Sequence, residues 1–163
     1  MTDSTDLATL VMLLGRLERL NEAFVTDACR RHGVTPAELR VLAALRHGVA
    51  QGPVRPTDIG RWVVQTSGGL TATLRRLEND GRIARVADDD DGRVRLVALT
   101  DDGARFYDEL LDELVDRYAR AFADLDVHLS LEAIRPLLAA FERTADTAAS
   151  AGWHVELEAE AAS

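Results

Sequence analysis

Apolar residues near the start of the chain recur at steps of three, four or seven, the period of a helix with one apolar face. They are Leu7, Leu10, Val11, Leu14, Leu17, Phe24, Val25 and Ala28. The stretch then reads Arg30-Arg31-His32-Gly33. Cations in the last turn followed by glycine are typical of a helix C-terminus. The pattern predicts a long amphipathic helix that ends before Gly33.

A second helix is predicted from Pro36 to His47. Thr35 is placed to cap it, Pro36 suits the first helical position, and Glu38 can reach back to complete a capping box. Its apolar positions are Leu39, Val41, Leu42 and Leu45.

The middle of the chain contains a loop, two short helices and two segments of β-strand character. A loop over 49–54 leads to a short helix from Pro56 to Val63, and a fourth helix follows from about residue 68 to 80, closed by Gly81. Residues 83–86 and 93–99 then alternate with a period of two. They predict a β-hairpin whose connection spans residues 87–92.

Two further helices are predicted after the hairpin. Thr100 is expected to cap a long fifth helix and Ser130 a sixth. The apolar face of the fifth comprises Phe106, Leu110, Leu111, Leu114, Tyr118, Ala121, Phe122 and Leu125; that of the sixth comprises Leu131, Ile134, Leu137, Leu138 and Phe141. The acidic, alanine-rich end of the chain reads as a frayed tail.

This order of elements predicts a mainly α fold with a small β-hairpin. Three short helices followed by a two-stranded wing are the plan of a winged helix-turn-helix. Helices one, five and six carry more apolar surface than so small a core can cover, so dimerisation is expected to bury it.

The fourth helix has the two faces that a DNA-reading helix needs. Leu70, Leu74 and Leu77 form a narrow apolar seam, whereas Arg75 and Arg76 lie on the opposite side. Its first turn, from Thr66, is small and polar, and its free backbone N–H groups suit phosphate. The residues expected to lie against base edges or adjoining backbone are Thr66, Ser67, Gly68, Gly69, Thr71, Ala72 and Thr73.

The two arginines are expected to divide between guanine and phosphate. A good bidentate contact to a base gives about 1–3 kcal/mol of discrimination. Taken alone, the segment also fits an ordinary surface helix with solvated arginines.

Composition places the chain in the globular class. It has 163 residues, of which 47% are hydrophobic and 29% charged, and its net charge is −9. That charge opposes binding to DNA, but its distribution is uneven: residues 55–86 hold six arginines and three acids. A basic segment in an acidic chain fits a protein that touches DNA with one surface only.

No apolar run approaches the ~20 residues that span a bilayer, and the N-terminus is acidic where a secretion signal would be basic. We therefore expect a cytoplasmic protein with no membrane partner. A single cysteine, Cys29, excludes a disulfide framework within the chain.

Several motifs together resemble the MarR family of bacterial transcription regulators over roughly residues 7–148. They are Leu70-Thr71-x-x-Leu74-x-x-Leu77-Glu78-x-x-Gly81-x-Ile83-x-Arg85, Asp91-x-Arg93, Val97-x-Leu99-Thr100-x-x-Gly103, and Thr35-Pro36-Ala37-Glu38-Leu39-x-Val41-Leu42-x-x-Leu45. The resemblance implies a homodimer formed by the first, fifth and sixth helices. It also implies a fourth helix in the major groove and Arg93 in the minor groove.

On this basis the chain divides into four parts. Residues 1–33 hold the N-terminal helix of a dimerisation region, 34–99 the DNA-binding domain, 100–148 the C-terminal helices of the dimerisation region, and 149–163 an acidic tail.

The wing departs from the family pattern. The family's wing commonly reads Asp-Arg-Arg, whereas this chain has Asp91-Gly92-Arg93 after three further aspartates. Because carboxylates repel phosphate, either the tip turns away from DNA or the wing contributes little. Asp91 can instead orient Arg93 through an ion pair, and Arg95 is a weaker candidate contact.

Metal and redox sites find little support. Aligning Gly92 with the invariant glycine of a calcium loop places Ala87 and Ala98 where carboxylates are required, so a solvated turn is the better interpretation. The four histidines lack paired spacing. Cys29 could sense oxidants, as in some relatives, but its place on the apolar face favours a small buried residue.

No nucleophile elbow, P-loop or dinucleotide fingerprint is present, so we expect neither an enzyme nor a cofactor. In the MarR family, aromatic acids often bind between the dimer helices and the DNA-binding lobe. Trp62 is either core or a wall of such a pocket, and Arg16 either faces an anionic effector or is solvated.

The leading hypothesis is a homodimeric repressor of transcription that binds a pseudo-palindromic operator in double-stranded DNA and is released by a small effector. The alternative is a ligand-binding or protein-interaction module on the same fold that has lost DNA binding, as the net charge and the acidic wing would allow.

Overall fold

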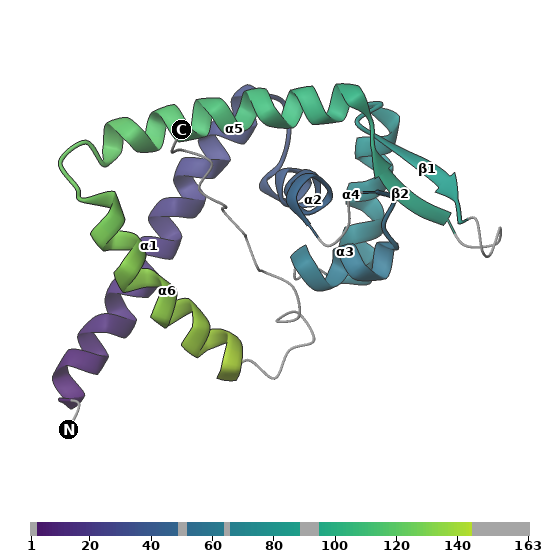
Figure 1. Ribbon diagram of the computed structural model, residues 1–163. Helices are drawn as coiled ribbons and strands as arrows, with labels where there is room; N and C mark the ends of the chain where they lie inside the picture. Colours follow the sequence, from purple (N-terminus) through teal and green to yellow (C-terminus); the bar gives the residue numbers. More distant parts are fainter. Residues whose placement is uncertain (1–2, 49–51, 64–65, 89–94, 145–163) are drawn as a thin grey trace, which may run out of the picture.

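A computed structural model of the protein describes residues 3–48, 52–63, 66–88 and 95–144 (Figure 1). The elements are α1 (Ser4–Arg31), α2 (Pro36–His47), α3 (Pro56–Val63), α4 (Ser67–Asn79), β1 (Ile83–Ala87), β2 (Arg95–Leu99), α5 (Asp101–Ala121) and α6 (Val127–Thr144). The predicted fold class, mainly α with a small β-hairpin, is confirmed.

Several of the predicted helix ends are formed by the residues that the sequence indicated. Thr35 accepts a hydrogen bond from the Glu38 N–H, and the Glu38 carboxylate accepts one from the Thr35 N–H, which completes the capping box of α2. Gly33 and Gly81 have φ angles of 68° and 71°, the left-handed region that glycine adopts at little cost.

The start of α6 and the end of α5 differ from the prediction. Asp126, not Ser130, caps α6: its Oδ1 accepts a hydrogen bond from the Leu129 N–H at 3.0 Å. The Ser130 hydroxyl lies inside the helix and donates to the Asp126 carbonyl. Aspartate is a preferred N-cap, so the helix begins one turn earlier. Because α5 ends at Ala121, Phe122 and Leu125 lie in the connection to α6.

The hairpin pairs Ile83 with Leu99 and Ala87 with Arg95 in antiparallel register. Val54, which the sequence assigned to a loop, forms an isolated bridge to Val97 through two backbone hydrogen bonds of 2.8 Å. The segment before α3 is thereby tied to the wing.

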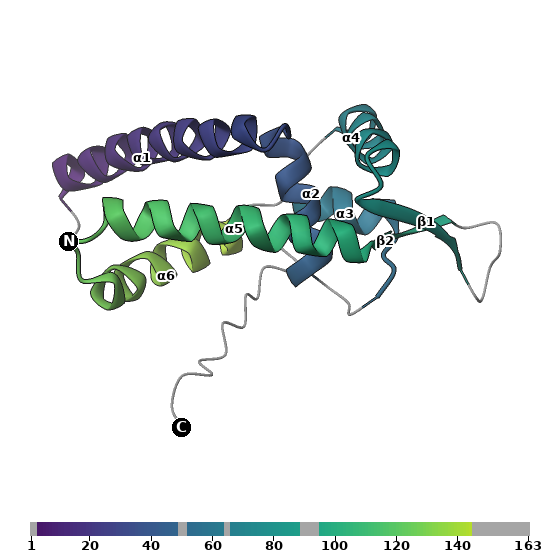
Figure 2. The same cartoon turned by 90° about the horizontal axis from the view of Figure 1, so that it is seen from above.

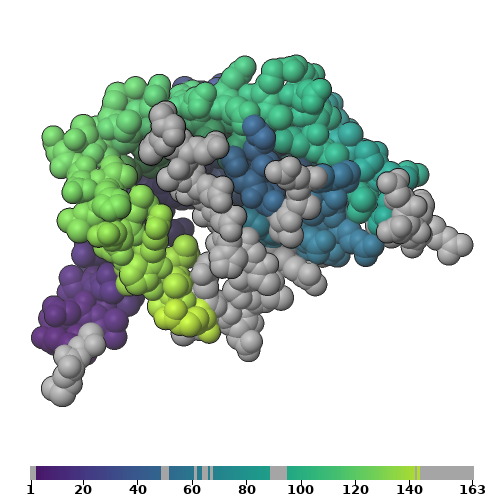
Figure 3. All heavy atoms as spheres, in the orientation of Figure 1, coloured from purple at the N-terminus to yellow at the C-terminus, as the bar shows by residue number. Residues whose placement is uncertain are grey.

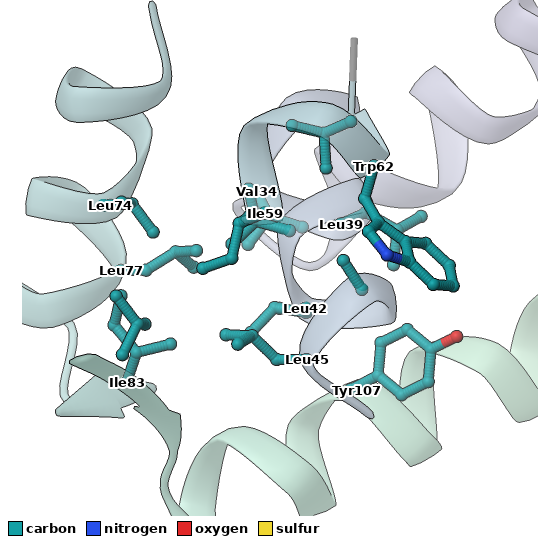
Figure 4. Close-up of a cluster of buried hydrophobic side chains, with 14 of the residues drawn as sticks. Val34, Leu39, Leu42, Leu45, Ile59, Trp62, Leu74, Leu77, Ile83 and Tyr107 are labelled. Carbon is teal, nitrogen blue, oxygen red and sulfur yellow. The ribbon is translucent and has the colours of Figure 1, made fainter. Parts of the chain in front are cut away.

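One core joins α2, α3, α4, the hairpin and the first half of α5 (Figure 4). Leu74 and Leu77 point from α4 toward Leu42 of α2 and Ile59 of α3. All four side chains are at most 2% exposed. Cys29 is fully buried in the same core, as expected from its place on α1.

The beginning of α5 contacts the DNA-binding lobe directly. A Cβ atom at Gly103 would lie 1.9 Å from the carbonyl oxygen of Arg82, so only glycine allows this approach. The Thr100 hydroxyl also donates to the carbonyls of Gly81 and Arg82. The first turn of α5 is therefore fixed to the turn between α4 and β1.

The helices outside this lobe form the other end of the molecule. In Figure 2, α1 and α6 lie on either side of α5. In Figure 3, the N-terminal half of α1 and the helix α6 lie at the end opposite to the hairpin. None of the helices in the described ranges is long and apolar enough to cross a membrane.

Leu42→Ala is expected to lower the free energy of unfolding by about 2–5 kcal/mol, because it leaves a cavity in a fully buried part of the core. Denaturant unfolding at fixed protein concentration measures the change. The exposed Glu109→Ala on α5 is the control and should stay within about 0.5 kcal/mol of wild type. Equal effects of the two variants would contradict this placement of the core.

Candidate DNA-binding surface

The helix α4 has one buried and one exposed side, as predicted. Leu70, Leu74 and Leu77 are 7%, 2% and 0% exposed, respectively. The residues of the opposite side are exposed: Gly68, Thr71, Ala72, Arg75, Arg76 and Asn79. The hydrophobic effect therefore determines which side of α4 is presented to solvent.

Thr73 does not belong to the exposed side, contrary to the prediction. It is 2% exposed, and its hydroxyl donates to the Gly69 carbonyl at 3.0 Å. Thr73 lies four residues before Leu77 and thus next to the apolar seam. Its side chain is therefore buried, and its hydroxyl is satisfied within the helix.

The first turn of α4 is held by Thr66. Its Oγ1 accepts a hydrogen bond from the Gly69 N–H at 3.2 Å, so this hydroxyl is a helix cap as well as a candidate contact. No acidic residue lies in the first turn. The positive end of the helix dipole and the remaining N–H groups are therefore available to an anion.

The two glycines of this turn differ in their surroundings. A Cβ atom added at Gly68 would meet nothing within 4 Å, whereas one at Gly69 would lie 3.1 Å from the Thr66 Oγ1. A side chain at position 69 would therefore press on the hydroxyl that forms the cap. Nothing within the described part of the protein requires glycine at position 68, so the open surface there is free for a partner.

Arg75 and Arg76 are both exposed but differ in their contacts. Arg76 donates from Nε to the Glu38 Oε1 at 2.7 Å. Arg75 has no hydrogen bond or ion pair with any residue that the structure describes. Sequence reasoning treated the two arginines alike because Glu38 lies 38 positions before Arg76, and no local spacing indicates the pair.

Most other arginines of residues 55–86 are also paired. Arg55 lies 3.2 Å from Asp88, Arg85 lies 3.6 Å from Glu78, and Arg82 lies 3.5 Å from Asp80 with its guanidinium over the Phe106 ring. The positive charge counted along the sequence is therefore partly neutralised within the fold. Arg75 remains as the unpaired cation of the exposed α4 face in the described ranges.

The wing is described only in part. Asp91 and Arg93 lie outside the described residues, so their predicted roles remain predictions. Arg95 is exposed at the first position of β2.

The two effector candidates lie in different surroundings. Trp62 is 8% exposed and packs in the core beside Tyr107 (Figure 4). Arg16 is exposed on α1. Among the described residues, no group of three or more His, Cys, Asp or Glu side chains could hold a metal ion.

The chain is similar in sequence and in structure to known transcription regulators. A sequence profile of the MarR family matches residues 32–94. A probable transcriptional regulator from Pseudomonas aeruginosa is similar at 27% identity and a TM-score of 0.65, over 80% of this chain and 94% of that one. The resemblance to the MarR family is confirmed.

Two further solved structures are similar to this chain. The YusO protein from Bacillus subtilis is 27% identical, with a TM-score of 0.60 over 88% of this chain and 99% of that one. A MarR family protein from Bacillus stearothermophilus shares the fold, at 17% identity and a TM-score of 0.73, over the same shares of the two chains. The curated proteins searched gave no match. MarR-family members are DNA-binding transcription regulators and not enzymes, in agreement with the sequence analysis.

Gly68→Ala separates folding from DNA binding. The added methyl group meets no described protein atom and favours the helix, so thermal stability should be unchanged or raised. It projects from the turn expected to approach DNA, and affinity should fall by about tenfold, equivalent to about 1.4 kcal/mol. Fluorescence anisotropy with labelled duplex measures the affinity.

Gly15→Ala on α1 is the matched control, because a Cβ there makes only an ordinary contact, 3.6 Å from the Arg19 Nη1. Wild-type affinity in Gly68→Ala would show that DNA does not approach this turn.

Proposed function

We propose that the protein is a homodimeric, sequence-specific DNA-binding repressor whose α4 helix enters the major groove and which a small effector releases. One observation carries the proposal. A single helix buries one side in the core and presents on the other a small, polar turn and an unpaired Arg75. A recognition helix needs this division.

Most residues proposed to contact DNA belong to the first half of α4, where the side chain of Ser67 lies outside the described part of the protein. Ser67, Gly68, Gly69, Thr71 and Ala72 would face base edges or the adjoining backbone, with Thr66 beside them. Arg75 is the candidate for a bidentate contact to guanine, because within the described protein it has no competing partner. Arg93 and Arg95 of the wing are proposed to lie near the minor groove, with Asp91 orienting Arg93.

Dimerisation is supported by the distribution of exposed apolar side chains. Every large hydrophobic residue that is exposed within the described ranges lies outside residues 34–99. They are Leu7, Val11, Met12, Leu13, Leu17, Leu20, Val115, Phe122, Leu125, Val127, Leu129, Leu131, Ile134, Leu138 and Phe141. So much exposed apolar surface is typical of an interface, and a second copy with the same surface can cover it.

This distribution also supports the division proposed from the sequence. Residues 1–33 and 100–148 would form the dimerisation region and residues 34–99 the DNA-binding domain. Two-fold symmetry then requires a pseudo-palindromic operator with half-sites about one helical turn, 34–36 Å, apart.

Release by an effector requires a ligand that binds better to a conformation whose recognition helices are wrongly spaced. Arg16, which is exposed on α1, is the proposed contact for the anionic group of an aromatic molecule, whereas the burial of Trp62 favours its assignment to the core. A thermal-shift screen of phenolic and other aromatic acids tests this, and a stabilising compound should also weaken DNA binding. A compound that stabilises the protein and leaves DNA affinity unchanged would not be the effector proposed.

The paired arginines and the net charge of −9 favour one alternative, an interaction module on the same fold that does not bind DNA. Arg75→Ala distinguishes the two functions. For a DNA reader, affinity should fall by about tenfold, and the slope of log K against log [salt] should become shallower by about 1 if a phosphate contact is also lost.

Arg120→Ala, which removes an equal charge from the last turn of α5, at the end of that helix away from the hairpin (Figure 1), is the matched control and should bind like wild type. Footprinting on DNA flanking the protein's own gene completes the test. No protection at low salt, together with an Arg75→Ala variant that behaves like wild type, would support the interaction module instead.

Leu138→Asp is expected to convert the dimer to a monomer, because it places a carboxylate on the apolar face of α6. Leu138 is 51% exposed in the single chain, so the protomer should remain folded by circular dichroism. Analytical ultracentrifugation measures the mass. Ala133→Asp, on another side of the same helix, should remain dimeric, and a dimeric Leu138→Asp would exclude this face from the interface.

A further inference from the structure

A buried carboxylate of α2 holds one of the two arginines of the recognition helix. Glu38 is 4% exposed, and its Oε1 accepts the hydrogen bond from the Arg76 Nε at 2.7 Å. A charged group so little exposed to water is retained only with partners that replace its hydration. Arg76 is one of those partners, although its own side chain is 54% exposed.

The second oxygen of Glu38 is fully used elsewhere. Its Oε2 accepts from the Thr35 N–H at 2.7 Å and from the Thr35 hydroxyl at 2.9 Å. The carboxylate is therefore fixed at both ends and cannot swing toward solvent. It offers Arg76 a rigid acceptor and not a flexible surface partner.

Burial alone would raise the pKa of Glu38. The hydrogen bonds from the Thr35 N–H, Arg76 and the Thr35 hydroxyl outweigh burial, so its pKa is lowered and the carboxylate stays ionised at neutral pH. Its interaction with Arg76 is thus a charge-assisted hydrogen bond in physiological conditions.

The contact leaves a particular part of the Arg76 guanidinium free. Nε is engaged with Glu38, and within the described residues the two Nη groups make no other hydrogen bond. Because Nε is bonded to a side chain of α2, the guanidinium of Arg76 is held beside that helix, whereas the guanidinium of Arg75 has no such contact among the described residues. The two Nη groups form a fork that fits the oxygens of a phosphate.

We propose that Glu38 is a positioning residue for DNA binding, which holds Arg76 so that its Nη groups clamp a DNA phosphate and not a base. This rests on the proposed role of α4 in DNA binding. It divides the two neighbouring arginines: Arg75 reads sequence, and Arg76 fixes the register of the helix on the backbone.

Anisotropy titrations with two labelled duplexes test the assignment, one from the DNA flanking the protein's own gene and one a scrambled duplex of equal composition. Arg76→Ala should weaken binding to both duplexes by the same factor, about tenfold, and make the salt slope shallower by about 1. Arg75→Ala should weaken binding to the flanking duplex more than to the scrambled one.

Glu38→Gln separates positioning from folding. Glutamine can complete a capping box, so α2 should keep its cap and thermal unfolding should change little. Without the carboxylate, Arg76 is no longer held, and affinity for both duplexes should fall by about three- to tenfold. In the Arg76→Ala background, Glu38→Gln should have no further effect on affinity.

Arg76→Lys provides a second variant that keeps the charge. An ammonium bound to Glu38 has no fork left for phosphate, so affinity should remain close to that of Arg76→Ala.

Full affinity in Arg76→Lys, unchanged or increased affinity in Glu38→Gln, or additive losses in the double variant would each overturn the assignment. Arg75→Ala should weaken binding whichever of these results is found for Glu38 and Arg76. Wild-type protein that binds neither duplex would instead overturn the proposed function itself.

Discussion

The packing of Leu74 and Leu77 against α2 and α3 is the contact on which the DNA-binding surface depends. Both side chains are at most 2% exposed, and their burial sets the rotation of α4 about its own axis. A rotation of one residue position, about 100°, would move a leucine into solvent and an arginine into the core. Apolar burial on one side of the helix therefore determines which polar groups face outward on the other.

Local features of the fold could be predicted from the sequence because each depends on neighbouring residues. Capping boxes, glycine at helix ends and apolar periodicity all act within about four positions. Where two local solutions competed, the prediction was wrong: Ser130 and Asp126 are both good caps, and the aspartate starts α6. Thr73 was misplaced for a related reason, since its polarity suggested solvent while its position beside the seam led to burial.

Contacts between distant segments could not be predicted. The bridge from Val54 to Val97 and the pair of Glu38 with Arg76 each require the tertiary structure, because nothing in the spacing of these residues indicates contact. For this reason, the number of charged residues in a segment does not by itself predict the charge of the surface that the segment forms. The arginines of residues 55–86 indicated a basic surface, and pairing with Asp88, Glu78 and Glu38 reduces it, so position rather than number decides what DNA would meet.

The close approach of Gly103 to Arg82 attaches α5 firmly to the DNA-binding lobe. One end is fixed to the turn that leaves the recognition helix, and the other carries the apolar residues of the proposed dimer interface. A helix of 21 residues is about 30 Å long, so a tilt of about 5° at one end displaces the other by about 2.6 Å. In the proposed dimer, a small change in the angle at which α5 packs at the interface would thus change the distance between the two α4 helices.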